Sequence, residues 1–420
     1  MGARVMAPLT KQVPMKSINM LLVLLAFGTA QAENWPGWRG PRGDGSCTEP
    51  NVPTQWSATS NVAWVADIPG HGHGSPIIWD DRIFLLTALT QKEERCLLCL
   101  DRKDGKLLWQ QTVVTAPLER KHGLNSFASS TPVTDGKLVY CTFLDQTNMV
   151  AAAYDYIGKL QWLVNPGVFS SKHGFCSSPV IFKDKLIING DHDGASYIVA
   201  LDRATGKTMW KIPREHHTRS YCTPLIRELA GKTQLILSGD MTVASYDPDT
   251  GARHWIIQGP TEQMVASLVY NEKANLLFYT GGFPELHILA IKPDGVGDIT
   301  KTHIAWRTMK GAGYVPSPAS LGDYFFNVTD QGTFSSYRAT DGAIQWSERL
   351  GSTHASLLTA NGLVYTLADS GLMTIIKPGP TFDVVARNEL GEKCFASPIV
   401  SRGQLFLRSD KHLFCIGQAH

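Results

Sequence analysis

The sequence lacks any concentration of charge of one sign. Lys and Arg number 39 and Asp and Glu number 37 among 420 residues, which gives a formal net charge of +2, and no five like charges stand in a row. Binding to nucleic acid relies on a basic patch or stripe. We therefore expect no nucleic-acid partner.

Long apolar runs are also missing, apart from one near the start of the chain. Residues 18–30 are largely apolar, but this run is too short to cross a bilayer. Three basic residues precede it and an Ala-Gln-Ala triplet ends it. The pattern predicts a signal peptide over residues 1–32, starting at Met1 or at Met15 and cleaved near Ala32. We expect a periplasmic or secreted protein that has no membrane insertion after cleavage.

Cysteine pairs that would define a redox or zinc site are scarce. Eight cysteines are present, the first is Cys47, and none is adjacent to another. Export permits disulfides, but their connectivity does not follow from sequence. Cys96 and Cys99 form a C-x-x-C motif within the apolar segment ERCLLCLD, without a second pair. We expect these two residues to be buried structural thiols.

A sustained helical period is absent as well, and a repeat takes its place. A segment of the form A-x-D-x-x-T-G-x-x-x-W ends at Trp109, Trp162, Trp210, Trp255 and Trp346, with weaker copies ending at Trp306 and near Val385. A second anchor, a Ser or Thr usually followed by Pro, recurs at Ser75, Thr131, Ser178, Thr223, Ser267, Ser317, Ser356 and Ser397. Successive anchors are 39 to 56 residues apart, which is typical of propeller blades.

Each repeat contains four short β segments separated by turns. In the D-x-x-T-G turn the Asp caps its own turn and the Gly takes a positive φ. A blade cannot bury both of its faces alone, so the large indoles are expected to pack between neighbouring blades. The predicted structural docking residues are Trp64, Trp109, Trp162, Trp210, Trp255, Trp306 and Trp346.

The two ends of the repeat region predict how the ring closes. The chain ends after LFCIG, which corresponds to a third strand, and Asn61–Ile68 has the pattern of a fourth strand. We predict an all-β fold, an eight-bladed β-propeller of four-stranded antiparallel blades, closed by pairing of this N-terminal strand with the strand that contains Leu413–Ile416. Residues 33–60 form an N-terminal extension and residues 61–420 form a single propeller.

The A-x-D-x-x-T-G-x-x-x-W repeat resembles the PQQ-like repeats of quinoprotein alcohol dehydrogenases and of the propeller lipoprotein of the outer-membrane barrel-assembly machinery. The segments KHGLNSFASSTP, HGFCSSP, NGDHDGASYIVALDRATGK and GPTEQMVASLVY are similar to those of secreted, non-lipidated PQQ-like propellers of unassigned function. The resemblance implies the propeller fold over nearly the whole mature chain. It implies no particular activity, because a fold shared by enzymes and non-catalytic relatives does not define one.

Candidate binding residues lie in the linkers that join the fourth strand of one blade to the first strand of the next. These linkers emerge on the same face as the hairpins between second and third strands, opposite the D-x-x-T-G turns. Seven of the 13 histidines fall there: His71, His73, His122, His173, His216, His217 and His354. The predicted ligand site consists of His73, His122, Asn125, His173, Arg219, Tyr221, Tyr314, His354 and Lys393.

No metal site is expected from sequence. The linker histidines show no short spacing such as H-E-x-x-H, and we expect them to hydrogen-bond turn backbones or to be hydrated at the channel mouth. Asn189, Asp191, Asp193 and Gly194 resemble the start of a calcium loop, but Ala200 stands where a bidentate Glu is needed. We predict a plain β-turn in this hairpin.

Enzyme activity is not expected either. The quinoprotein dehydrogenases to which the repeat is similar carry two adjacent cysteines and longer insertions between blades, and this sequence has neither. PQQ and calcium are therefore not expected as cofactors, although a PQQ-dependent dehydrogenase stays open as an alternative. Gly-x-Ser-x-Gly is absent, which disfavours a hydrolase.

The leading prediction is a non-catalytic binding or scaffold protein with an envelope or secreted partner protein. The second hypothesis is a small-ligand or glycan-binding module on the histidine-rich face. A flat protein-binding face presents exposed aromatic residues and Arg, whereas a small-ligand site is concave.

Overall fold

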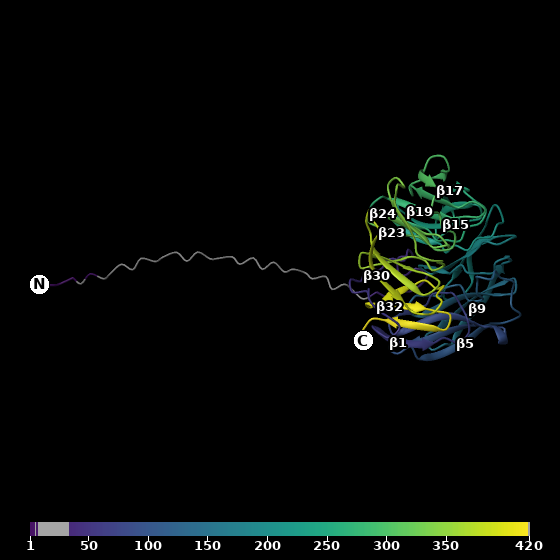
Figure 1. Ribbon diagram of the computed structural model, residues 1–420, viewed down its shortest axis with the longest axis horizontal. Helices are drawn as coiled ribbons and strands as arrows, with labels where there is room; N and C mark the ends of the chain where they lie inside the picture. The colour runs from purple at the N-terminus through teal and green to yellow at the C-terminus, as the bar shows by residue number, and fades with distance from the viewer. Residues whose placement is uncertain (5, 7–32, 419–420) are drawn as a thin grey trace. The chain divides into compact units, whose positions relative to one another are not determined.

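The computed structural model describes residues 1–4, 6 and 33–418 (Figure 1). The chain divides into two units, Met1–Gln31 and Ala32–His420, and every described strand belongs to the second. The predicted signal peptide over residues 1–32 lies almost entirely outside the described residues. Within the part that the structure describes, no helix is long and apolar enough to cross a membrane.

The second unit is a ring of eight antiparallel sheets, each with the strand order predicted from the repeat. Blade 1 consists of β2 (Ile77–Trp79), β3 (Arg82–Leu89), β4 (Glu94–Asp101) and β5 (Leu107–Thr115), and blade 2 of β6 (Val133–Thr134), β7 (Leu138–Asp145), β8 (Asn148–Asp155) and β9 (Leu160–Val168). Blade 3 consists of β10 (Val180–Phe182), β11 (Lys185–Gly190), β12 (Tyr197–Asp202) and β13 (Thr208–Pro213). Blade 4 consists of β14 (Leu225–Leu229), β15 (Lys232–Gly239), β16 (Thr242–Tyr246) and β17 (Arg253–Gln258).

Blade 5 consists of β18 (Val269–Asn271), β19 (Leu276–Gly281), β20 (His287–Ile291) and β22 (Ile304–Thr308), and blade 6 of β23 (Ala319–Leu321), β24 (Tyr324–Val328), β25 (Thr333–Arg338) and β26 (Ile344–Arg349). Blade 7 consists of β27 (Leu358–Ala360), β28 (Leu363–Leu367), β29 (Leu372–Lys377) and β30 (Asp383–Glu389). Blade 8 consists of β31 (Ile399–Ser401), β32 (Gln404–Arg408), β33 (His412–Ile416) and β1 (Val62–Asp67). The predicted eight-bladed fold is confirmed.

The N-terminal strand closes the ring. β1 pairs antiparallel with β33, with Trp64 opposite Cys415 and Ala66 opposite Leu413. In Figure 1 the purple β1 lies beside the yellow C-terminal strands of the same sheet. The predicted closure between residues 61–68 and the last strand is confirmed, and β1 covers the edge of β33 that would otherwise be unpaired.

Blade 4 has a fifth strand that the repeat did not predict. β21 (Gly297–Asp298) pairs in parallel with β17, with Trp255 opposite Gly297. It belongs to an extended turn between β20 and β22 of the next blade. Ile299 is 1% exposed, and its N–H donates to Ile256 O at 2.9 Å. Burial of this aliphatic side chain accounts for the docking of the insertion against the outer edge of blade 4.

The alternating pattern of each strand sends successive side chains to opposite faces of its blade. On β4, Cys96 and Leu98 enter one core cluster, whereas Leu97 and Cys99 enter another. The two cysteines of the C-x-x-C motif therefore lie on opposite sides of one sheet. All eight cysteines are free thiols, and burial raises the pKa of Cys99 to about 12.

The repeated tryptophans join one blade to the next. Their indole Nε1–H groups donate to turn carbonyls of the following blade in six pairs: Trp64 to Arg102, Trp109 to Tyr156, Trp162 to Arg203, Trp210 to Pro248, Trp306 to Ala339 and Trp346 to Gly379. The turn glycine is needed because a Cβ at Gly206, where φ is +74°, would lie 2.8 Å from the Trp162 ring. Trp255 differs, since it donates to Gln234 of its own blade, and Gln234 donates to Pro293 O of the next.

The Ser and Thr anchors form a hydrogen-bonded belt around the channel. At seven junctions the backbone N–H of one anchor donates to the hydroxyl oxygen of the next, at 2.9 to 3.3 Å. At the eighth, Ser75 Oγ donates to Ser397 O at 3.0 Å. The belt gives each anchor hydroxyl a partner in the neighbouring blade and explains why a hydroxyl residue recurs at this position.

Residues 33–49 cross the ring at the face of the first-to-second-strand turns. They contact seven blades through Ile78, Thr134, Arg227, Ser267, Pro318, Thr359 and Arg402. Trp38 Nε1 donates to the anchor hydroxyl of Ser267 at 3.1 Å, and the buried Arg39 donates to Pro318 O at 2.6 Å. This segment therefore reaches the belt and fills the channel from the face opposite the linkers.

Candidate functional site

The linkers and the second-to-third-strand hairpins pack together at one end of the blades, which we call the linker face. Asp193 N, in the hairpin of blade 3, donates to Ser170 O of the preceding linker at 2.9 Å. Asp369 N, in the hairpin of blade 7, donates to Ser352 O at 2.8 Å. The linker face is therefore built from paired loops, and its side chains stand on a backbone that is hydrogen-bonded to the scaffold.

Hairpin aspartates fix the linkers further. Asp240 accepts hydrogen bonds from the backbone N–H groups of Glu215, His216 and Thr218 at 2.8 to 3.0 Å. Asp330 accepts from the N–H groups of Tyr314 and Val315, and Asp369 accepts from that of His354. In each of these three linkers, a single hairpin carboxylate therefore holds the backbone in place through hydrogen bonds.

The first group of predicted site residues centres on His173. The His122 and His173 rings meet edge to face with centroids 5.6 Å apart, and the His173 and Tyr221 centroids are 6.0 Å apart. Asn125 Nδ2 donates to His173 O at 2.7 Å. Gln263 connects this group to Tyr314, since its Nε2 lies 3.2 Å from His173 Nδ1 and also donates to the Tyr314 hydroxyl. We call these six residues the His173 group.

Burial favours the neutral form of three members of the His173 group. Burial lowers the pKa of His173, and the nearby positive charges of Arg219 and His122 lower it further. Burial raises the pKa of Tyr221 and of Tyr314 above the ordinary value. The pKa shifts therefore favour a neutral imidazole at His173 and neutral phenols at Tyr221 and Tyr314, which are donors and acceptors of hydrogen bonds.

The second group lies where blades 7, 8 and 1 meet. The His73 ring stacks on Phe395 with centroids 4.6 Å apart, and Phe395 lies 5.5 Å from the His354 ring. His71 meets His73 edge to face at 4.8 Å, and His71 Nε2 lies 3.7 Å from Asp410 Oδ1. We call His71, His73, His354, Phe395 and Asp410 the His73 group.

The histidines of the His73 group differ in charge. Burial lowers the pKa of His73 to about 3, and the charges of His71, Arg408 and Lys121 act in the same direction. For His354, burial also disfavours the charged ring, but the hydrogen bond and charge of Asp369, 2.8 Å from Nδ1, outweigh it and raise the pKa. His73 is therefore neutral at physiological pH, whereas His354 holds its proton more tightly than a free histidine does.

Two of the predicted site residues, Arg219 and Lys393, lie outside both groups. Arg219 Nη1 donates to Asp193 at 2.8 Å and lies 3.9 Å from Glu262, so its guanidinium is paired within the linker face. Lys393 has an exposed side chain, and its carbonyl accepts the N–H of Asp410 at 3.0 Å. The structure thus brings seven of the nine predicted residues into the two groups and places Arg219 and Lys393 beside them.

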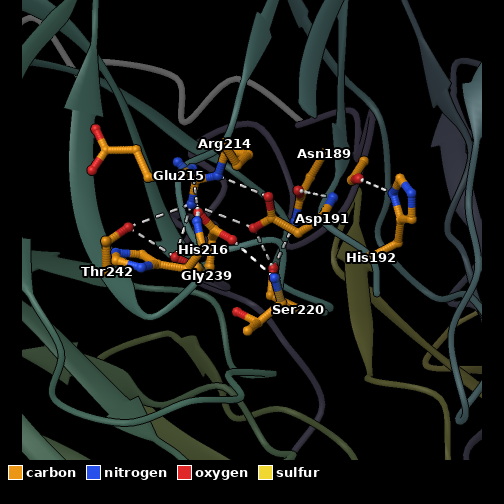
Figure 2. A network of polar contacts seen from close by, with 12 residues as sticks. Asn189, Asp191, His192, Arg214, Glu215, His216, Ser220, Gly239 and Thr242 are labelled. Carbon is orange, nitrogen blue, oxygen red and sulfur yellow. Dashed lines mark hydrogen bonds and ion pairs between the residues drawn. The ribbon is translucent and has the colours of Figure 1, made fainter. Parts of the chain in front are cut away.

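The segment that resembles a calcium loop is part of a buried ion-pair network (Figure 2). Arg214 Nε donates to Asp191 Oδ1 at 2.8 Å, and Ser220 Oγ donates to Asp191 Oδ2 at 2.7 Å. Arg214 also donates to Gly239 O at 2.8 Å and to the Tyr246 hydroxyl. Burial opposes the charge on Arg214, but Asp191 outweighs it and raises the arginine pKa. The Asp191 carboxylate therefore ties blade 3 to blade 4 and serves a structural role beyond that of a turn residue.

Sequence reasoning missed Gln263, Phe395 and Asp410. Asp410 was within reach of the sequence, because it occupies the hairpin position that holds Asp330 and Asp369 in two other blades. Gln263 and Phe395 carry no such repeated signal. Their roles depend on contacts between linkers that are far apart in the chain.

Two cavities lie near these groups. The larger, about 350 Å³, adjoins the His173 group and is lined by Glu119, Arg120, Leu144, Gln146, Thr147, Phe169, Ser170, Ser171, Lys172 and Asp193. A smaller one, about 160 Å³, lies beside Arg214 and Asp240 between blades 3 and 4. Both cavities are offset from the ring axis and lie between neighbouring blades.

The fold and the linker face define an eight-bladed β-propeller whose linkers and second-to-third-strand hairpins gather at one end. The family model described as "Outer membrane protein assembly factor BamB" matches residues 53–188 and 93–275, which together span more than half of the chain. The chain belongs to this family of PQQ-like propellers.

Solved structures show the same fold at low sequence identity. BamB from Moraxella catarrhalis is 14% identical, with a TM-score of 0.58, over 87% of this chain and 98% of that one. Quinohemoprotein alcohol dehydrogenase from Comamonas testosteroni is 12% identical, with a TM-score of 0.67, over 92% and 81% of the two chains. A computationally designed protein, Ika8, is 11% identical, with a TM-score of 0.58, over 85% and 100%. A search of curated proteins found no significant match.

Proposed function

We propose that the protein is a non-catalytic binding propeller of the cell envelope or secreted space, and that it binds a partner protein through its linker face. The observation that carries the proposal is that all eight linkers contribute side chains to the two groups above. The other end of the channel is filled by residues 33–49. The linker face is the opposite end of the ring, and it carries the linkers and the hairpins between second and third strands, where binding residues are commonly found.

The composition of the linker face favours a protein partner. Exposed apolar side chains stand on linkers or hairpins of several blades, among them Leu124 (53% exposed), Met241 (36%), Phe283 (55%) and Met309 (55%). They alternate with exposed polar residues such as His122. Aromatic and Met side chains among polar groups are typical of protein interfaces.

The family match supports an envelope location. The matching model is described as an outer membrane assembly factor, and the sequence predicts an export signal over residues 1–32. Both point to a protein that works outside the cytoplasm. We propose on these grounds that the mature chain is periplasmic or secreted.

Two carboxylates of the linker face, those of Asp330 and Asp369, do not fit a quinone and calcium pair. Asp330 accepts two backbone N–H groups, and Asp369 binds His354 through both of its oxygens. Recruiting either carboxylate to calcium would leave those donors without a partner, which costs free energy. We therefore propose that the protein works without PQQ, and no reaction step is assigned to it.

Site-specific photo-crosslinking tests the proposal. A benzophenone amino acid at Leu124 would report on the linker face, and one at Ile157, 81% exposed in the turn after β8, would report on the opposite face. We expect envelope fractions of the source organism to give a specific protein adduct from position 124, which excess unlabelled protein removes, and none from position 157. Adducts from position 157 alone, or from neither position, would contradict the proposal.

A small-ligand or glycan-binding function is the second candidate, favoured by the larger cavity. Its volume of about 350 Å³ is within the range of small-ligand pockets, and its lining includes the charged residues Glu119, Arg120, Lys172 and Asp193. A thermal-shift screen of glycans and organic anions tests it. A true ligand should raise the melting temperature of the wild type and of Lys103→Ala, on the opposite face, but not that of Lys172→Ala.

A further inference from the structure

We propose that His71, His73 and Asp410 form a binding site for one transition-metal dication, with Zn²⁺ as the ion that best suits the ligand set. One ligand atom from each of the three side chains lies within 4.8 Å of the other two. Two imidazoles and one carboxylate are a ligand set used for zinc and for other late first-row metals, whereas Ca²⁺ and Mg²⁺ prefer oxygen ligands alone.

The local sequence holds the two imidazoles on the same side of the chain. His71 forms an antiparallel bridge with Ala88, with N–H to O distances of 3.0 and 2.9 Å in the two directions. In such extended backbone, residues i and i+2 point to the same side. A Cβ at Gly72 would lie 2.6 Å from Arg408 Nη2 and 2.9 Å from Leu86 O. The H-x-H segment is therefore fixed by a close approach that only glycine permits.

Asp410 differs from the equivalent hairpin aspartates in having its carboxylate available. Asp240, Asp330 and Asp369 each accept backbone N–H groups of the adjacent linker. Among the described residues, the contact of the Asp410 carboxylate is with His71 Nε2 at 3.7 Å. Two ligands of a tetrahedral zinc ion with bonds of about 2.0 to 2.1 Å are roughly 3.4 Å apart, so a small side-chain rotation completes the geometry.

The protonation and charges around the site shape its affinity. Metals bind the neutral imidazole, and burial lowers the pKa of both His71 and His73, so neither must lose a proton at pH 7. The positive charges of Arg408 and Lys121 act on both rings and oppose a dication. We therefore expect weaker binding than at closed structural zinc sites.

Three protein ligands leave the metal with at least one open position. His71 is the exposed member of the set, whereas His73 is covered by Phe395. The open position therefore faces the solvent side of the linker face, where water or a side chain of a bound protein would complete the coordination.

Metal titration of the exported protein, stripped with a chelator, tests the proposal. Calorimetry with Zn²⁺ and visible spectroscopy with Co²⁺ should show one ion per chain and a tetrahedral or five-coordinate Co²⁺ band. Asp410→Asn and His71→Gln should each weaken binding at least tenfold. His216→Gln, which alters an exposed histidine of another linker, is the matched control and should bind as the wild type does.

A second measurement needs no variant and guards against loss of folding. Pulsed electron paramagnetic resonance of the Cu²⁺-loaded wild type should detect two coordinated imidazoles. No stoichiometric binding, a spectrum without two imidazoles, or equal loss of affinity in His216→Gln and the site variants would each overturn the site.

Discussion

The Ser75 hydroxyl donates a hydrogen bond to the Ser397 carbonyl at 3.0 Å, across 322 residues of sequence. It is the eighth junction of a belt in which the other seven use a backbone N–H as donor and a Ser or Thr hydroxyl as acceptor. At those seven junctions the donor belongs to the preceding blade, whereas at the junction of blades 8 and 1 it belongs to the following blade. The belt links all eight blades at the level where the linkers enter the channel.

Removing one belt hydroxyl should destabilise the ring. Thr131 is fully buried and its Oγ1 accepts the Ser75 N–H at 3.1 Å. Thr131→Val keeps the shape but leaves a buried donor unpaired, so we expect a loss of about 1 to 3 kcal/mol in the free energy of unfolding. Chemical denaturation measures it. Thr131→Ser keeps the hydroxyl and is the control, and equal losses in the two variants would show that the hydrogen bond is unimportant.

The inter-blade tryptophans should contribute more through packing than through hydrogen bonding. Trp162 is 8% exposed, contacts Tyr140 and donates to Arg203 O at 2.9 Å. Trp162→Ala should cost about 3 to 5 kcal/mol because it opens a cavity between blades 2 and 3. Trp162→Phe should cost less than half as much. A loss below about 1 kcal/mol in the alanine variant would show that the indole is not an inter-blade contact.

Acid should loosen the N-terminal segment through Glu33. Its hydrogen bond with Arg42 is the main reason that the pKa of Glu33 falls from an ordinary 4.5 to about 2. A lowered carboxyl pKa stabilises the folded state above pH 4.5, and this stabilisation disappears as the pH falls from about 4.5 to 2.

Glu33→Gln isolates this effect. The difference in unfolding free energy between wild type and variant should be about 1 to 2 kcal/mol at pH 7, after allowance for solvent screening, and should vanish near pH 2. Melting curves over this pH range measure it. A difference that stays constant with pH would assign the effect to packing and not to the carboxylate.

The protein should be inert toward quinone chemistry. Purified protein mixed with PQQ and Ca²⁺ is expected to show neither stoichiometric quinone binding nor alcohol-dependent dye reduction, because the carboxylates of Asp330 and Asp369 are engaged and no two cysteines are adjacent. Absorbance titration and a dye assay check both, with a PQQ-dependent alcohol dehydrogenase as positive control. Binding at micromolar quinone together with turnover would refute the non-catalytic proposal.

The fold followed from sequence because its determinants are local and repeated. The turn motif, the docking tryptophans and the anchors lie within single repeats, and the missing strand of the last blade predicted the role of β1. β21 was missed because it lies in an insertion with no repeat motif. The path of residues 33–49 was not predictable either, since Trp38 and Arg39 make contacts with blades more than 200 residues away.

The candidate site was predictable to a lesser extent. Linker position indicated the correct face for His122, His173 and Tyr221, and the structure brings these rings together. The direction of each side chain could not be predicted from linker position, and the Arg219 guanidinium donates a hydrogen bond to the Asp193 carboxylate. The approach of Asp410 to His71 depends on ring closure, because the two residues come from opposite ends of the propeller sequence.

Closure by β1 also sets the order in which the protein can finish folding. In seven blades the four antiparallel strands come from one continuous stretch of chain, so each blade can form soon after that stretch is synthesised. β1 is synthesised first and its partner β33 last. β1 therefore stays unpaired through almost the whole of synthesis, and its backbone N–H and C=O groups are accessible to other chains during that time. Yield during overproduction should therefore depend on how fast the C-terminal strands arrive, and loss of β33 alone should leave a nearly complete ring with an aggregation-prone gap.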